Sequence, residues 1–213
     1  AGHANKITVK VYKDGSLSVE DNGRGMPVDI HPEYGQSGIE IILTKLHAGG
    51  KFSTDNYQFS GGLHGVGISV VNALSSRVEV TVQRQGNLYK MAFNQGEAAA
   101  PLEVLEGKAP KRASGTLVHF WPEAKYFDSP KFALKALKHN LKAKAVLAAG
   151  LEIHYIDEIN DEEIVWQFEN GLVDYLMDEL EDREIVPAPA FVATGEAERA
   201  SAEFAICWNV EGG

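Results

Sequence analysis

The residues from Ser60 to Ser75 (SGGLHGVGISVVNALS) combine a cluster of glycines with an apolar run at helical spacing. The glycines are Gly61, Gly62, Gly65 and Gly67, and the apolar positions are Val66, Val70, Ala73 and Leu74. Glycine lets an anion approach the main chain closely, and a helix start adds unpaired N–H groups and the positive end of the helix dipole. The stretch therefore predicts a phosphate-binding loop; the alternative is a flexible surface loop before a core helix.

Two common phosphate-binding loops do not fit this chain. A P-loop requires Gly-Lys followed by Ser or Thr, but Phe52 follows Gly50-Lys51. The dinucleotide-binding fingerprint requires G-x-G-x-x-G after a strand, whereas the spacing here is G-x-x-G-x-G after a polar, turn-like segment. A nucleotide would have to be held in some other way.

Asp21 is the second candidate for chemistry, because it stands where an alternating run meets a glycine-flanked turn. A carboxylate there can accept a hydrogen bond from an exocyclic amine, which would select adenine over guanine. Such a bond to a charged group contributes about 1.5–3 kcal/mol. The alternative is an Asx-turn residue that serves only its own backbone.

The composition limits the class of protein. The chain has 213 residues and a formal net charge of −10, which argues against a DNA-binding surface in this part of the protein. No apolar run is long enough to span a membrane, so we expect no membrane association. Cys207 is the single cysteine, which suits a reducing cytoplasm.

The hydrophobic patterns indicate the elements that position these residues. Alternation predicts hairpins over 7–19 and 78–93 and a strand over 116–121. A capping box, Ser37-x-x-Glu40, predicts a helix to about His47. A second helix is expected over 66–74, and the long segment 48–65 between them is typical of a lid, a binding loop or a disordered segment.

The C-terminal half continues the pattern of strands and helices. Ser129-Pro130 predicts the start of a helix that ends before Gly150, with a buried stripe at Phe132, Ala136, Leu137, Leu141 and Ala145. Its lysines, at 131, 135, 138 and 142, form either a solvated face or a contact surface. Paired strands over 151–156 and 164–168, a helix over 172–180, a break at Pro187-Ala188-Pro189 and a last strand over 204–208 follow. The fold class is α+β with a mixed sheet.

The motifs together resemble a known superfamily. Asp21-x-Gly23-x-Gly25, followed by Gly62-Leu63-His64-Gly65-Val66-Gly67, resembles the two nucleotide-binding boxes of the GHKL ATPases. The stretches 25–32, 46–52 and 60–75 are similar to the B subunits of bacterial type II topoisomerases. Within that family, the stretches 57–59, 118–122 and 142–147 are more similar to topoisomerase IV than to gyrase. The resemblance implies a two-layer sandwich, with helices on one face of a mixed sheet.

The resemblance also implies roles for individual residues. Asp21 would bind the adenine amine, with Gly25, Met26 and Thr116 lining the base pocket. Backbone N–H groups near the phosphates would come from Gly62, Leu63, His64, Gly65, Val66, Gly67 and Ile68, and Lys51 and Tyr57 would lie in the closing segment. Arg24, Pro27 and Arg84 would flank the mouth of the pocket, where competitive inhibitors of the family, aminocoumarins among them, make contacts. Arg24 and Arg84 could equally be ordinary surface charges.

The same resemblance implies a cofactor and partners. ATP and Mg²⁺ are expected, with the catalytic glutamate and the magnesium-binding asparagine on a helix upstream of Ala1, so that no catalytic or metal-binding residue is assigned here. We expect residues 1–213 to form an ATP-binding domain fragment, with 185–213 as a terminal linker and last strand. The full enzyme would use a topoisomerase A subunit, a second B subunit and DNA bound through other domains. Alternatives are the B subunit of gyrase, a nucleotide-binding module without turnover, or another GHKL branch such as mismatch repair.

Overall fold

The computed structural model describes residues 4–46, 66–110, 113–129, 131–181, 183–197 and 200–210. The chain divides into two compact units. The first combines Ala1–Leu134 with His154–Ile164, and the second combines Lys135–Ile153 with Val165–Gly213. The predicted site residues all belong to the first unit.

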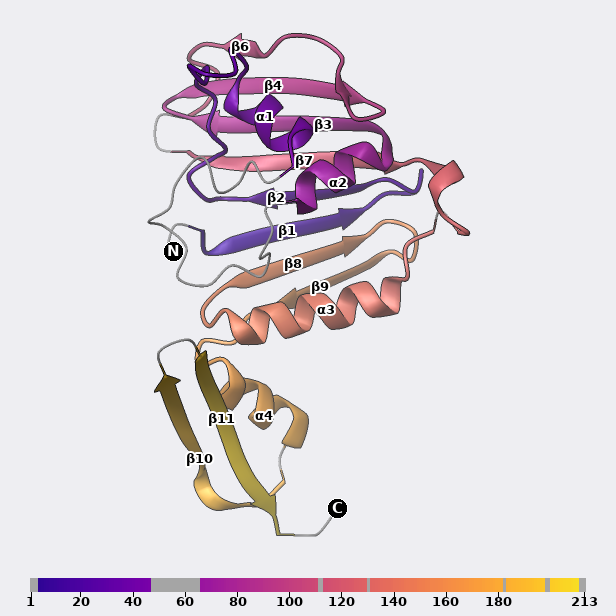
Figure 1. Ribbon diagram of the computed structural model, residues 1–213. Coiled ribbons are helices and arrows are strands. Elements are labelled where there is room, and N and C mark those ends of the chain that lie inside the picture. The colour runs from indigo at the N-terminus through magenta and orange to yellow at the C-terminus, as the bar shows by residue number, and fades with distance from the viewer. Residues whose placement is uncertain are drawn as a thin grey trace. The chain divides into compact units, whose positions relative to one another are not determined.

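A large sheet forms the frame of the first unit (Figure 1). Its strands follow one another in space as β5-β4-β3-β7-β2-β1-β8-β9, with β6 also beside β4. The bounds are β1 Lys6–Val11, β2 Leu17–Asp21, β3 Ser75–Arg84, β4 Asn87–Asn94, β5 Glu97–Ala98, β6 Glu103–Leu105, β7 Gly115–Pro122, β8 Glu152–Asp157 and β9 Glu162–Trp166.

Both predicted hairpins are confirmed. β1 pairs antiparallel with β2, and β3 pairs antiparallel with β4. The first reversal is fixed by Asp14, whose Oδ1 accepts a hydrogen bond from the backbone N–H of Ser16 at 2.9 Å. β7 lies between the two hairpins, so that Val118 faces Val19 on one side and Val80 on the other. Thus β7 joins two local ribbons into one sheet.

The sheet is mixed, as the pattern of elements predicts. The backbone N–H of Glu158, just beyond β8, donates to the carbonyl of Val11, the last residue of β1, at 3.0 Å. The carboxyl ends of these two strands therefore lie together, and the strands run parallel (Figure 1).

Two short helices cover one face of this sheet, α1 (Gly38–Thr44) and α2 (Gly67–Ala73). Ser37 caps α1 as predicted, because its Oγ accepts from the N–H of Glu40 at 3.3 Å. The Glu40 carboxylate accepts from the side-chain amide of Gln36 and does not return to Ser37. α1 ends at Thr44, earlier than the predicted end near His47, while α2 agrees with the predicted helix.

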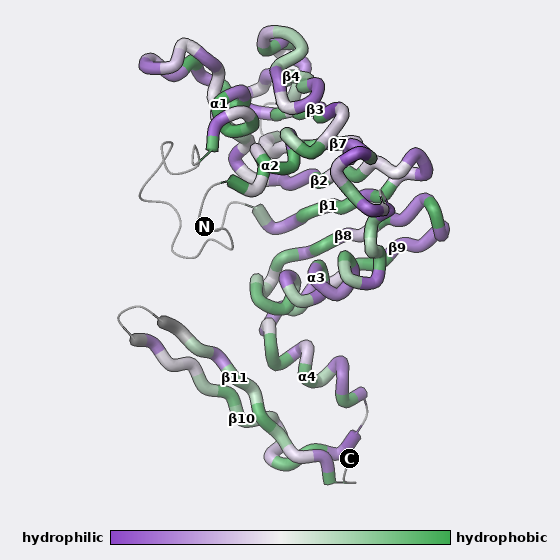
Figure 2. Tube along the Cα trace, turned by 45° about the vertical axis from the view of Figure 1, so that its right-hand side comes forward, coloured by the Kyte–Doolittle hydropathy of each residue, from purple (hydrophilic) through white to green (hydrophobic). Residues whose placement is uncertain are grey.

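The core lies between these helices and the sheet. Ile39 and Leu43 of α1 pack on buried side chains of β3, β4 and β7 and of the loop before α1. Both helices carry hydrophobic stretches in Figure 2. The cluster contains Val28, Ile39, Leu43, Val78, Val80, Val82, Tyr89, Met91, Phe93 and Val118. Alternate residues of β3 and β7 therefore face the helices, and the residues between them face away.

The second unit holds α3 (Leu134–Leu147), α4 (Leu172–Leu180), β10 (Ile185–Ala197) and β11 (Ala200–Asn209). The predicted start of α3 at Ser129 is wrong. The Ser129 Oγ accepts from the N–H of Lys131, and this local turn competes with a helical turn. The predicted buried stripe of α3 holds at Leu141 and Ala145, but Ala136 is exposed.

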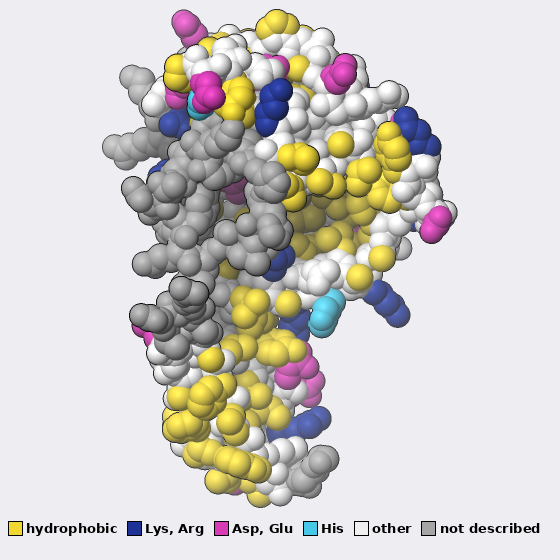
Figure 3. All heavy atoms as spheres, in the orientation of Figure 1, with side chains coloured by type: hydrophobic (Ala, Val, Ile, Leu, Met, Phe, Trp, Pro, Cys, Tyr) yellow, Lys and Arg dark blue, Asp and Glu magenta, His cyan; other side chains and the backbone are white. Residues whose placement is uncertain are grey.

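The predicted break at Pro187-Ala188-Pro189 is only partly right: β10 runs through it, but the pairing with β11 is interrupted there. The pairing register shifts between Val186 and Phe191. Two prolines, which cannot donate to the ladder, are accommodated by this irregularity. Figure 3 shows hydrophobic side chains gathered over the resulting two-stranded sheet. None of the helices within the described ranges is long and apolar enough to cross a membrane.

Candidate functional site

Asp21 and Thr116 lie next to each other on the helix-covered face of the sheet. Asp21 is the last residue of β2 and pairs with Thr116 of β7, which in turn pairs with Val82 of β3. Paired residues on neighbouring strands point to the same face, and Val82 is fully buried in the core. The Asp21 carboxylate and the Thr116 hydroxyl are therefore brought together at the edge of the hydrophobic core.

The Asp21 carboxylate has two oxygens with different surroundings. Oδ1 accepts a hydrogen bond from the N–H of Gly23 at 2.8 Å, which is the Asx turn considered as an alternative. Oδ2 makes no hydrogen bond to any other residue that the structure describes. The turn thus fixes the carboxylate in place and leaves one oxygen as an acceptor, so the two interpretations of Asp21 are compatible.

The loop after β2 packs tightly against the ends of β3 and β7. Gly25 has a φ of +75°, and a Cβ there would lie 2.9 Å from Val82 Cγ1 and 3.0 Å from the Gln83 carbonyl. The N–H of Met26 donates to Thr116 Oγ1 at 3.1 Å, and the Met26 side chain packs against the core. Glycine at 25 is required here, because any side chain would push this loop away from Thr116.

The residues predicted to flank the mouth of the pocket lie in the loop after β2 and at the end of β3. Arg24 is exposed and Pro27 is partly buried in the same loop, while Arg84 is the last residue of β3. A Cβ at Gly38 would lie 2.4 Å from the Pro27 carbonyl, so the loop also touches the start of α1.

Only three of the predicted phosphate-binding residues lie among the residues that the structure describes. Val66 is the N-cap of α2 and has no side-chain cap; Gly67 is exposed, and Ile68 packs against the core. The remaining members of that prediction, Lys51, Tyr57, Gly62, Leu63, His64 and Gly65, lie outside the described residues. Their roles stay predictions.

Gly115 is a further residue of this site that sequence reasoning did not single out. A Cβ at Gly115 would lie 2.2 Å from the carbonyl oxygen of Asp21. Real Cβ atoms do not approach a carbonyl so closely, so a glycine is needed for β7 to start beside Asp21. The signal in the sequence was the Ser114-Gly115 turn immediately before the strand.

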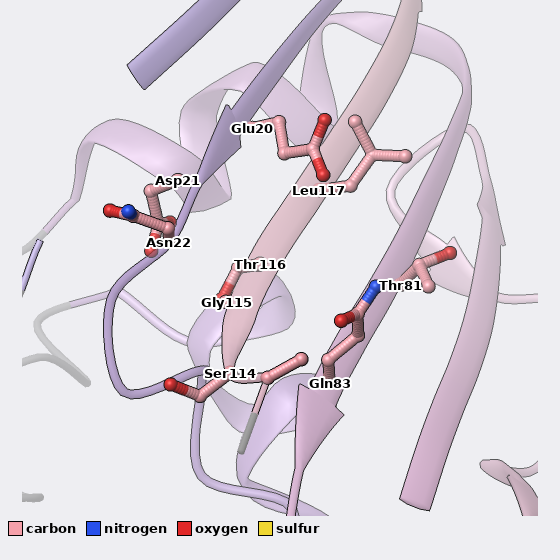
Figure 4. Close-up of a pocket in the computed structure, with 10 residues that line it drawn as sticks. Glu20, Asp21, Asn22, Thr81, Gln83, Ser114, Gly115, Thr116 and Leu117 are labelled. Carbon is pink, nitrogen blue, oxygen red and sulfur yellow. The ribbon is translucent and has the colours of Figure 1, made fainter. Parts of the chain in front are cut away.

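A hollow of about 380 Å³ lies near these residues but on the opposite face of the sheet (Figure 4). The side chains of Glu20, Thr81 and Leu117 line it and alternate with Asp21, Val82 and Thr116 along their strands. It is therefore not the predicted base pocket. Its full lining is Glu20, Asp21, Asn22, Thr81, Gln83, Ala113, Ser114, Gly115, Thr116 and Leu117.

The face of the sheet opposite α1 and α2, called the open face below, also carries a stack of rings around His119. The His119 ring lies 4.5 Å from that of Tyr12 and 3.9 Å from that of Trp121, measured between centroids. Its Nε2 shares a hydrogen bond of 2.8 Å with the buried Oγ of Ser16, and Asp14 accepts from both Ser16 and Trp121. Burial lowers the pKa of His119 below its ordinary value.

The described ranges contain no group of three or more His, Cys, Asp or Glu side chains that could hold a metal ion.

Comparison with known proteins supplies the family. Residues 1–125 match the model of the histidine kinase-, DNA gyrase B- and HSP90-like ATPases. Over all 213 residues the chain is 55% identical to the B subunit of DNA topoisomerase 4 from Pseudomonas aeruginosa, and it spans 34% of that relative's length.

Two solved structures share the fold. The ATP-binding domain of Francisella tularensis topoisomerase IV, in complex with a small-molecule inhibitor, has a TM-score of 0.75 and 46% identity, over 92% of this chain and 51% of that one. The 43K ATPase domain of Thermus thermophilus gyrase B, in complex with an aminocoumarin, has a TM-score of 0.80 and 35% identity, over 95% of this chain and 50% of that one. This chain is thus a member of the histidine kinase-, DNA gyrase B- and HSP90-like ATPase family.

Proposed function

We propose that this chain is the ATP-binding domain of the B subunit of a bacterial type II topoisomerase, of the topoisomerase IV kind. The observation that carries the proposal is the 55% identity to a topoisomerase IV B subunit along the whole chain. The chain spans about a third of that relative's length, so strand passage, relaxation and decatenation belong to the larger protein.

The geometry around Asp21 supports recognition of an adenine ring. Oδ2 of Asp21 accepts the exocyclic amine, while Oδ1 remains in the turn with Gly23. Thr116 and Met26 lie beside the ring, on the apolar edge of the core. The phosphates extend toward the start of α2, where Gly67 leaves the backbone open to an anion.

The remaining parts of the proposal concern the larger protein. Mg²⁺ neutralises phosphate charge when it is bound, and its protein ligand and the general base are assigned to no residue of this chain. ATP binding pairs two B subunits, and an A subunit and DNA complete the enzyme, which acts in the cytoplasm. Small molecules that occupy the base pocket compete with ATP.

The B subunit of gyrase is the second candidate, and the fold alone does not separate the two. The gyrase structure has the higher TM-score, 0.80 against 0.75, but the lower identity, 35% against 46%. Sequence identity favours topoisomerase IV. The full-length protein, combined with its A subunit, should unlink catenated circles without introducing negative supercoils; ATP-dependent supercoiling would establish the gyrase assignment.

Asp21→Asn tests the base pocket directly. The amide presents a competing donor, and loss of a charge-assisted hydrogen bond costs about 1.5–3 kcal/mol, so affinity for a non-hydrolysable ATP analogue should fall about 10- to 150-fold. Calorimetric titration measures it. Asp29→Asn is the matched control, because Asp29 is exposed in the loop before α1. An unchanged affinity in Asp21→Asn would refute the assignment of the base pocket.

A further inference from the structure

We propose that the hollow on the open face of the sheet is a second ligand site, which binds a small organic cation carrying an ammonium or guanidinium group. The site is distinct from the base pocket. Glu20 and Leu117 point into it, while their chain neighbours Asp21 and Thr116 point to the helix-covered face (Figure 4). A single layer of backbone separates the two.

The hollow is built across three strands. Leu117 pairs with Glu20 of β2 and with Thr81 of β3, so one cross-strand row forms one wall. In the next row Gln83 pairs with Gly115, which contributes only backbone. Gly115 packs closely against the backbone of Asp21, so this row adds the Gln83 side chain and backbone atoms to the lining. The volume of the hollow, about 380 Å³, is within the range of small-molecule sites.

The polar groups of the hollow are available to a ligand. The side chains of Glu20, Thr81, Gln83 and Ser114 make no hydrogen bond or ion pair with any other described residue, and all four line the hollow. A small number of polar side chains that converge on one space can fix the orientation of a ligand.

Several polar groups elsewhere on the open face bind to one another. Ser16 bonds to Asp14 and His119, Trp121 donates to Asp14, and Arg77 pairs with Glu79 and lies over the Trp121 ring. These polar groups are thus engaged with one another, whereas the four in the hollow have no described partner. The exposed Lys90 pairs with Thr81 and lies beside the hollow on the same face.

The chemistry of the lining selects the ligand. Glu20 is the charged side chain that points into the space, and a carboxylate binds ammonium or guanidinium through charge-assisted hydrogen bonds. The Gln83 amide and the hydroxyls of Thr81 and Ser114 add acceptors, and Leu117 offers an apolar wall for a short alkyl chain. An anion would be repelled by Glu20 and by the negative net charge of the chain.

Titration with agmatine, followed by amide chemical shifts in two-dimensional NMR spectra, tests the site. Agmatine has a guanidinium and an ammonium on a four-carbon chain, and 1,6-hexanediol serves as a neutral molecule of similar length. We expect saturable shifts at Thr81, Gln83 and Leu117 with agmatine and none with the diol. Glu20→Gln should weaken agmatine binding at least tenfold, and Thr81→Val at least threefold.

Glu97→Gln is the matched control, because Glu97 is an exposed acid of the same sheet on β5. It should bind agmatine as the unmodified chain does, and so should Asp21→Asn, which separates this site from the base pocket. Shifts spread over the acidic surface, or equal binding by Glu20→Gln and Glu97→Gln, would overturn the proposal. Glu20 is exposed, so its replacement should leave the fold intact. A loss of agmatine binding in Glu20→Gln would therefore report on the site and not on unfolding.

Discussion

Gly115 determines how closely β7 can start beside the end of β2. Gly115→Ala would place a methyl group 2.2 Å from the Asp21 carbonyl, so the strands must separate. We expect a loss of about 1–3 kcal/mol in the free energy of unfolding and weaker binding of ATP analogues, because Asp21 moves with the strand. Urea unfolding and calorimetry measure the two effects.

The same substitution at Gly195 provides the control for Gly115→Ala. A Cβ there meets no atom within 4 Å. Gly195→Ala should change stability by less than about 0.5 kcal/mol. If both variants were equally stable, close packing at Gly115 could not explain the need for glycine.

His119 makes stability depend on pH. Because burial lowers its pKa in the folded state, the unfolded chain binds the proton more readily. The stabilisation due to neutral His119 is complete above the unfolded pKa of about 6.5 and is lost as the pH falls through the lower folded value. Urea unfolding at pH 7.5 and 5.5 should show a drop that is smaller in His119→Gln. His139→Gln, at an exposed position, should keep the full drop.

For single residues, the sequence predicted the chemical role of a side chain better than the contacts around it. Asp21 was identified as an acceptor or as a turn residue, and the structure gives one oxygen to the turn. The contact between Met26 and Thr116 joins residues distant in sequence. It could not be predicted from the residues, because it depends on β7 lying beside β2.

Elements with a local cause were predicted well. The alternating hairpins and the Ser37 cap depend on neighbouring residues, and both are confirmed. The strand over 116–121 was predicted, but its position between the hairpins depends on packing between distant segments. β10 was missed because two prolines normally end a strand, and here a register shift accommodates them.

Lys142, in the lysine stripe of α3, contacts three side chains of α4. Lys142 Nζ lies 2.8 Å from Glu179 Oε1 and 3.3 Å from Asp178 Oδ2 of α4, and 5.0 Å from the centre of the Tyr175 ring. These contacts are largely exposed to solvent, so Lys142→Met should cost less than about 1 kcal/mol of stability. Urea unfolding at low and high salt measures it, with Lys135→Met as the control on the same helix. A loss of several kcal/mol would show that this contact is essential to the packing of α3 with α4.

At the scale of the molecule, the boundaries between the two units cannot be located from the sequence alone. The motifs of the resemblance extend over both units, and composition does not change sharply at either boundary. Such a division depends on which segments contact one another, which a single sequence does not state.

The two-stranded sheet of the second unit exposes a row of large apolar side chains. Phe204, Ile206 and Trp208 alternate along β11 and are 43%, 43% and 66% exposed, and Phe191 of β10 pairs with Ile206. We expect the chain to self-associate as concentration rises, and more strongly in sulfate. Phe204→Lys combined with Trp208→Lys should shift the sedimentation profile toward monomer, whereas Leu147→Lys, at an exposed apolar position on α3, should not.

The parallel neighbours β1 and β8 have a consequence for how the protein is made. The β1–β2 ribbon is complete once residue 21 has been synthesised, but the strands that flank it begin only at Gly115 and Glu152. On the ribosome, both edges of the ribbon therefore stay open while most of the chain is still being translated. Pairing between such distant segments is slow. Until β7 and β8 emerge, these open edges can pair with neighbouring polypeptides.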